Sequence, residues 1–233
     1  MTQYLTNIIE NLTRIEAEEG EKLSRVARLV ADVIERDGLI YIFGCGHSHL
    51  PALDCFYRAG GLANVSPVLD TDLMLHNGGA KSSRIEKMSG IAPEIFRRYK
   101  ITERDILFVI SASGKNSVPV EMAEAARAAG ITTVGISSAN YYNDNARLHN
   151  IVDVAIDCKV PHGDASVEVG EVKMGGLSTY AACFIMNSVL IEGAKIALEE
   201  GTTPPIFKSG NIDGGKEYNL ALEEMYLGRV KHL

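Results

Sequence analysis

Short apolar runs alternate with longer helical patterns along most of the chain, and this alternation limits the possible fold more than any other feature. The runs are typical of strands near 39–43, 64–69, 105–110, 131–136 and 151–156. Most are apolar throughout, as expected of strands that are covered on both faces of a parallel sheet. The sequence therefore predicts an α/β fold, doubly wound and flavodoxin-like, with a five-stranded parallel sheet.

Segments with helical periodicity separate and follow these strands. They cover 3–36, 48–59, 82–99, 118–129, 139–148, 173–199 and 217–231. We expect one domain, 1–233, in which the long N-terminal helix and the C-terminal segment are packing or oligomerisation extensions. The apolar stripe of 3–36 and the uncharged run 174–191 together offer more apolar surface than one sheet covers, so a homodimer or homotetramer is expected.

Charge and composition argue against several partners. The net charge of −7 attracts neither nucleic acid nor an anionic membrane surface. The uncharged run 174–191 contains glycine, serine and asparagine, which are costly in lipid, so we expect a buried helix there and no membrane partner. The N-terminus is polar and the four cysteines form no CxxC pair, which predicts a cytoplasmic protein.

Ligands of an open parallel sheet bind beyond the carboxyl ends of its strands, and hydroxyl-rich loops follow the first, third and fourth predicted strands. The loop after the third strand has small residues that let backbone N–H groups converge beside the N-terminus of the next helix. It predicts a phosphate site made by Ser111, Ser113, Gly114 and Asn116. Ordinary helix capping is the alternative for these side chains. Ser137 and Ser138, at the same edge, are predicted sugar contacts.

Two familiar nucleotide loops do not fit the sequence. His49 stands where a dinucleotide fingerprint needs its third glycine, and Val109 stands where a Walker A loop needs its first. Neither NAD nor ATP is therefore predicted, and we expect no cofactor. The spacing of His47 and His49 matches no familiar structural zinc pattern, so no metal is expected either.

Three segments resemble the sugar isomerase (SIS) domain family: Gly44-Cys45-Gly46-His47-Ser48, Ser111-Ala112-Ser113-Gly114-Lys115-Asn116 and Gly175-Gly176-Leu177-Ser178-Thr179. The chain looks most similar to a poorly characterised branch described as phosphoheptose isomerases. The resemblance implies a phosphorylated sugar as ligand, and dimers or tetramers with sites near subunit interfaces. It also implies that Ser111, Ser113 and Asn116 hold the phosphate, while Gly46, His47 and Ser48 approach the sugar.

Aldose–ketose isomerisation needs a group that moves a proton between adjacent carbons. The catalytic candidates are Glu86, which follows a glycine-containing loop, Glu171, which precedes the late helix, and His47. Each glutamate is alternatively a solvated helix residue, and His47 a loop hydrogen-bonding residue. The predicted function is a sugar-phosphate isomerase. The alternatives are a sugar-phosphate sensor without catalysis and a carbon–oxygen lyase that resembles the family's etherases.

Overall fold

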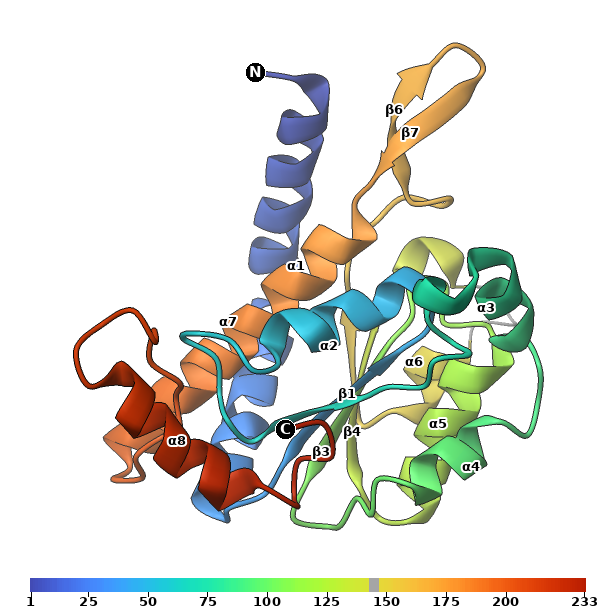
Figure 1. Cartoon of the computed structure of the whole chain (residues 1–233). Helices are drawn as coiled ribbons and strands as arrows, with labels where there is room; N and C mark the ends of the chain where they lie inside the picture. The colour runs from blue at the N-terminus through green and yellow to red at the C-terminus, as the bar shows by residue number, and fades with distance from the viewer. Residues whose placement is uncertain (143–146) are drawn as a thin grey trace.

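The computed structural model describes residues 1–142 and 147–233, and it contains a five-stranded parallel sheet (Figure 1). The strands are β1 (Ile40–Gly44), β2 (Val65–Val68), β3 (Ile106–Ile110), β4 (Thr132–Ser137) and β5 (Val154–Asp157). They lie in the order β2-β1-β3-β4-β5. The predicted fold class is confirmed. The predicted fifth strand is displaced, because residues 148–151 form a short helix and β5 begins only at Val154.

Helices cover both faces of this sheet (Figure 1). The α-helices are α1 (Gln3–Glu35), α2 (Leu50–Cys55), α3 (Gly79–Ile85), α4 (Ala92–Arg97), α5 (Ser117–Ala128), α6 (Leu148–Ile151), α7 (Ser178–Glu199) and α8 (Gly215–Tyr226). The 3-10 turns are η1 (Gly46–His49), η2 (Leu75–Asn77) and η3 (Ala139–Tyr141). Side chains alternate along each strand. Ile40 and Ile42 of β1 join the core under α1 and α7, whereas Tyr41 and Phe43 join the core under α4 and α5.

The helices α1 and α7 pack with their backbones close together. A Cβ atom added at Gly193 of α7 would lie 2.5 Å from Val30 Cγ1 and 2.8 Å from the carbonyl oxygen of Ala27. By length and composition alone, α7 could cross a membrane. Half of its most apolar window is nevertheless buried inside the protein, and a core helix meets the same test.

An antiparallel hairpin of β6 (Ala165–Val169) and β7 (Val172–Gly176) precedes α7. The expected helix 173–199 is therefore wrong at its start. Gly175 has a φ of 81°, which interrupts a helix, and α7 begins only at Ser178. The hairpin lies beside the first turns of α1, since the Tyr4 hydroxyl donates to the Gly176 carbonyl at 2.8 Å. Both rise beyond the rest of the molecule (Figure 1).

Other boundaries also differ from the predictions. The expected helix 82–99 consists of α3 and α4, with Gly90 at a φ of 88° between them. The predicted helix 48–59 is the shorter α2, and the predicted helix 217–231 is α8, which ends at Tyr226. Of the predicted helix 139–148, residues 143–146 lie outside the described residues; η3 covers its start.

The close approach of α1 and α7 predicts that Gly193→Ala destabilises the protein by about 1–3 kcal/mol, because the new methyl group overpacks against Val30. Gly20→Ala is the matched control. Gly20 also lies inside a helix, and a Cβ there would meet nothing within 4 Å. The control should gain about 0.5–1 kcal/mol from helix propensity. Urea unfolding of both variants measures the difference, and a neutral Gly193→Ala would contradict the packing.

Candidate functional site

The loops that follow β1, β3 and β4 meet at the carboxyl edge of the sheet. The parallel register pairs Gly44 with Ile110 and Ile110 with Ile136, so the residues after these strands lie side by side. Two backbone hydrogen bonds continue this pairing beyond the strands. The Ser111 N–H donates to the Ile136 carbonyl at 3.0 Å, and the Ser138 N–H donates to the Ala112 carbonyl at 2.9 Å.

The loop Ser111–Asn116, which we call the serine loop, turns tightly at Gly114. The φ of Gly114 is 63°, a left-handed value that favours glycine, and its N–H donates to the Ser111 carbonyl at 3.0 Å. The Ser111 hydroxyl also accepts from this N–H at 3.2 Å. Ser113 and Asn116 are half-buried, and their side chains donate or accept no hydrogen bond within the part of the chain that the structure describes. These polar groups are therefore available to a ligand.

Helix α5 begins directly after the serine loop. Asn116 is its N-cap residue, with an extended backbone and no side-chain capping bond. The helix is 12 residues long, so its N-terminus presents partial positive charge to the loop. The helix start is anchored from the other side, because the Val118 N–H donates to the Glu86 carbonyl at 3.1 Å. The Ser117 hydroxyl likewise donates to the Lys87 carbonyl at 3.0 Å.

The loop after β1 supplies His47 and Ser48 to the same edge. Gly46 is fixed by its N–H, which donates to the Leu73 carbonyl at 2.8 Å. A small hollow of about 10 Å³ separates this loop from the start of α7. Its lining includes His47, Ser48, Ala112, Cys158, Ser178 and Thr179. The hollow has room for about one water molecule, so a larger ligand would lie over the loops that border it.

Glu86 lies at the end of α3, close to the serine loop and to the loop after β1. It is half-buried, and its side chain makes no hydrogen bond among the described residues. Burial raises its pKa, while the charge of Lys87 lowers it by a smaller amount. The carboxylate is close enough to Cys45 to raise the pKa of that thiol, although burial of the thiol has the larger effect. Glu86 therefore has the environment of an acid–base group.

The other predicted site residues have less favourable positions. The Ser138 hydroxyl donates to the Val160 carbonyl at 2.6 Å, and the Ser137 hydroxyl hydrogen-bonds to the Tyr142 hydroxyl at 2.9 Å. Both serines are buried, so their hydroxyls serve the fold here. Glu171 is exposed in the turn between β6 and β7, and the structure does not bring it to the serine loop of its own chain.

Two residues near the site were not predicted from the sequence. The Asp164 carboxylate accepts hydrogen bonds from the backbone N–H groups of Leu177 and Ser178, at 3.0 and 2.8 Å, and thereby caps α7. It precedes the helix by a whole hairpin, so no short-range pattern reveals it. His49 is buried, and its Nε2 has no partner among the described residues. Burial lowers the pKa of His49, which favours a neutral ring.

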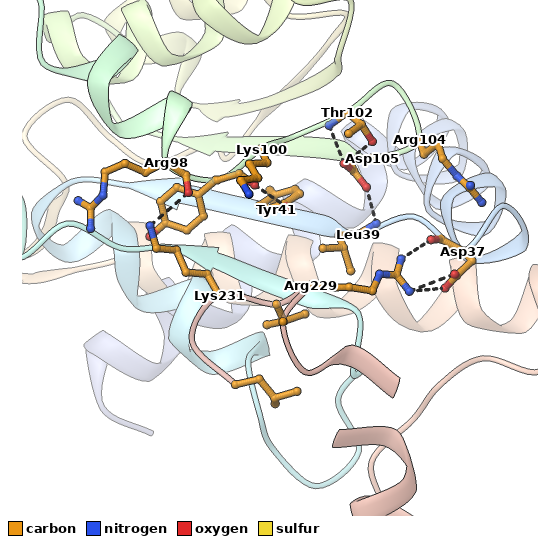
Figure 2. A pocket seen from close by; sticks show the side chains of 14 residues that line it. Asp37, Leu39, Tyr41, Arg98, Lys100, Thr102, Arg104, Asp105, Arg229 and Lys231 are labelled. Atoms are coloured by element: carbon orange, nitrogen blue, oxygen red, sulfur yellow. Dashed lines mark hydrogen bonds and ion pairs between the residues drawn. The ribbon is translucent and has the colours of Figure 1, made fainter. Parts of the chain in front are cut away.

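No group of three or more metal-binding side chains was found among the described residues. A much larger hollow, of about 750 Å³, lies at the opposite edge of the sheet (Figure 2). None of the predicted site residues lines it. The carboxyl edge remains the candidate site, because there the unpartnered side chains, the helix N-terminus and the half-buried carboxylate occur together.

Comparison with known proteins agrees with the predicted family. A model of the SIS domain matches residues 3–138. A UPF0309 protein of Thermoanaerobacter pseudethanolicus is 36% identical over 246 residues, which cover 100% of both chains. A UPF0309 protein of Geobacillus thermodenitrificans is 38% identical over 237 residues, covering 98% of this chain and 95% of that one.

Two solved structures share the fold at low sequence identity. A phosphoheptose isomerase from Neisseria gonorrhoeae has a TM-score of 0.56 and 16% identity, covering 81% of this chain and 94% of that one. The Vibrio vulnificus NanR protein, complexed with ManNAc-6P, has a TM-score of 0.53 and 14% identity. That alignment covers 99% of this chain and 69% of the NanR chain.

The raised pKa of Glu86 predicts a pH-dependent gain of stability in Glu86→Gln. In the unfolded chain this carboxyl ionises near pH 4.3, whereas in the folded protein it ionises only at higher pH. The folded state therefore loses stability as pH rises from below 4.3 through the folded pKa. Glutamine lacks this loss, so the variant should be more stable than wild type at pH 7.5.

Thermal unfolding at pH 7.5 and pH 4.0 measures the effect. The advantage of Glu86→Gln should become much smaller at the lower pH, where most of this carboxyl is protonated in both states. Glu224→Gln, a change at an exposed glutamate of α8, is the control and should show no such difference between the two pH values. An equal advantage at both pH values would mean that the charge of Glu86 is not its source.

Proposed function

The chain belongs to the SIS domain family, and we propose that it binds a phosphorylated sugar with the phosphate held by the serine loop. The observation that carries this proposal is the pair of unpartnered polar side chains, Ser113 and Asn116, at the N-terminus of α5. A phosphate there would accept hydrogen bonds from these side chains and from backbone N–H groups, and the helix dipole would stabilise its charge.

Neutral donors suit a protein of this charge. With a net charge of −7, the chain repels anions at long range, so affinity has to come from short-range hydrogen bonds. Lys115 is the rival ligand in the same loop. Its ammonium lies 5.9 Å from the centre of the Tyr141 ring, so a cation–π contact competes with any phosphate for this charge.

We further propose that the protein is a sugar-phosphate isomerase in which Glu86 is the general base. The Glu86 carboxylate would take the proton from the carbon beside the sugar carbonyl and return it to the neighbouring carbon through an enediol. Burial raises the pKa of this group toward the working pH, which favours both halves of the transfer. His47, exposed on the loop after β1, would contact the sugar oxygens, together with Gly46 and Ser48.

A sensor without catalysis is the second candidate. The NanR protein that shares this fold is complexed with ManNAc-6P, so the fold supports recognition of a phosphorylated sugar. A third candidate is a carbon–oxygen lyase, which would use the same acid–base residue.

We propose a cytoplasmic protein that works as a single SIS-type domain without cofactor, metal, nucleic acid or membrane. Glu171 would take part in the reaction only if it reached the site of a second copy of the chain.

The serine loop predicts that Ser113→Ala weakens sugar-phosphate binding by about tenfold or more, since one hydrogen bond to a charged group contributes about 1.5–3 kcal/mol. Lys115→Ala, the matched change two residues later, should have a smaller effect. Isothermal titration of both variants compares them. If Lys115→Ala abolishes binding and Ser113→Ala leaves it intact, neutral donors do not hold the phosphate.

The ligand for this titration comes from a thermal-shift screen with a panel of sugar phosphates. NMR of the stabilising compound during incubation with the protein separates an enzyme from a sensor. An isomerase converts the compound, and Glu86→Gln abolishes conversion while it keeps binding. A sensor stabilises without conversion, and failure of every sugar phosphate to stabilise the protein would contradict the proposed function.

We also propose a homodimer or homotetramer. Apolar side chains are exposed on the first turns of α1 and on the hairpin: Leu5, Ile9, Val169, Val172 and Met174. Further exposed residues, Ile191 and Leu198 of α7, line a separate hollow. Light scattering at micromolar concentration should give at least twice the chain mass of 25.2 kDa. A stable mass of 25.2 kDa would exclude the assembly.

A further inference from the structure

The large hollow at the amino edge of the sheet gathers positively charged side chains (Figure 2). We call it the amino-edge groove. It lies between the starts of β1 and β3, the segment 98–105 and the segment 228–233. Its charged side chains are five cations, Arg98, Lys100, Arg104, Arg229 and Lys231, and two carboxylates, Asp37 and Asp105. A chain of net charge −7 therefore has a local excess of positive charge in this groove.

Both carboxylates of the groove already have partners. Asp105 is buried and accepts hydrogen bonds from the backbone N–H groups of Leu39 and Thr102, each at 2.7 Å. Asp37 pairs with Arg229 at 2.9 Å, as Figure 2 shows. These carboxylates therefore leave most of the positive charge of the groove uncompensated.

The remaining cations have little compensation. Within residues 1–142 and 147–233, Lys100, Arg104 and Lys231 form no ion pair, and Arg98 has a single contact, at 3.3 Å, with Asp70. Arg104 instead donates to the backbone carbonyl of Arg36. Lys100 is exposed, and its side chain makes no hydrogen bond, ion pair or ring contact with the described residues. Lys100 is therefore free to turn toward a bound anion, whereas Arg104 would have to give up its bond to the Arg36 carbonyl.

Arg98 and Lys231 are held near each other at one end of the groove. The Lys231 ammonium donates to the Arg98 backbone carbonyl at 3.2 Å and lies 4.5 Å from the centre of the Tyr99 ring. Burial lowers the pKa of Lys231, and the charge of Arg98 lowers it further. The like charges of the two side chains therefore repel each other, and an anion between them would relieve the repulsion.

We propose that the amino-edge groove binds a small, multiply charged anion, a metabolite with a phosphate or diphosphate group, through Arg98, Lys100 and Lys231. Its volume of about 750 Å³ is in the range of small-molecule sites. Val230 and Tyr99 give the organic part of such a ligand an apolar wall. An extended polyanion such as nucleic acid fits less well, because the net negative charge of the chain repels it outside the groove.

This site is distinct from the serine loop, which lies at the other end of the same strands. β1 has five residues, and strands rise about 3.3 Å per residue, so the two edges are about 15 Å apart. The groove also uses charged groups, whereas the serine loop uses neutral donors. Variants of one site can therefore leave the other intact.

Isothermal titration of the full chain with inorganic pyrophosphate tests the proposal. In the Ser113→Ala background, which weakens the serine loop, pyrophosphate should still bind one site per chain. Lys231→Gln and Lys100→Gln should each weaken that binding by about tenfold, because each removes one charge-assisted hydrogen bond. The Lys100 side chain is exposed and makes no hydrogen bond or ion pair with the described residues. Lys100→Gln should therefore fold as the wild type does, so weaker binding would report the lost charge.

Lys216→Gln is the matched control, since Lys216 is exposed on α8 and does not line the groove. It should leave the pyrophosphate affinity unchanged. Absence of pyrophosphate binding in the Ser113→Ala background would overturn the proposal, and so would binding that Lys216→Gln weakens as much as Lys100→Gln. Neither result bears on sugar-phosphate binding at the serine loop, which is measured separately.

Discussion

The pairing of β1 with β3 fixes where the strands begin and end, and therefore the positions of the amino edge and the carboxyl edge. At the amino edge, the buried Asp105 carboxylate accepts hydrogen bonds from the Leu39 and Thr102 backbones and holds the starts of the two strands together. The register then runs from Ile40–Ile106 to Gly44–Ile110. A slip of one residue would turn every side chain to the opposite face and would separate the loops of the carboxyl edge. Because its carboxylate is buried, replacing Asp105 would leave backbone donors unsatisfied.

The strands were predictable because a strand that is buried on both faces has an apolar sequence throughout, as Ile106–Ile110 does. The hairpin was not. Its strands mix Val167 and Val169 with polar neighbours and stay largely exposed, so no core imposes a pattern on them. The sequence after Lys173 is uncharged, as is the first part of the buried helix α7. The sequence therefore does not show where the hairpin ends and α7 begins.

The site was predictable to the extent that strand order determines it. Residues that follow parallel strands share one edge, so the sequence alone predicts that Ser111, Ser113 and Gly46 lie at the same edge. The partners of each hydroxyl were not predictable. Ser138 resembles Ser113 in sequence, yet its hydroxyl donates to Val160, more than twenty residues later. Such long-range bonds depend on the final packing, which a single sequence does not display.

The two sites that we propose, one at each edge of the sheet, would attract an anion in different ways. At the carboxyl edge, Ser113, Asn116 and the start of α5 offer neutral dipoles whose attraction falls off within one turn of the helix. The phosphorylated sugar that we propose for this site would therefore have to fit closely, and selectivity for its shape would accompany affinity. At the amino edge, exposed cations such as Lys100 act over the Debye length, about 8 Å at physiological ionic strength. They attract an anion before it is in contact, and they discriminate by charge more than by shape. The net charge of −7 repels anions from the molecule as a whole, so binding at either proposed site depends on the groups of that site.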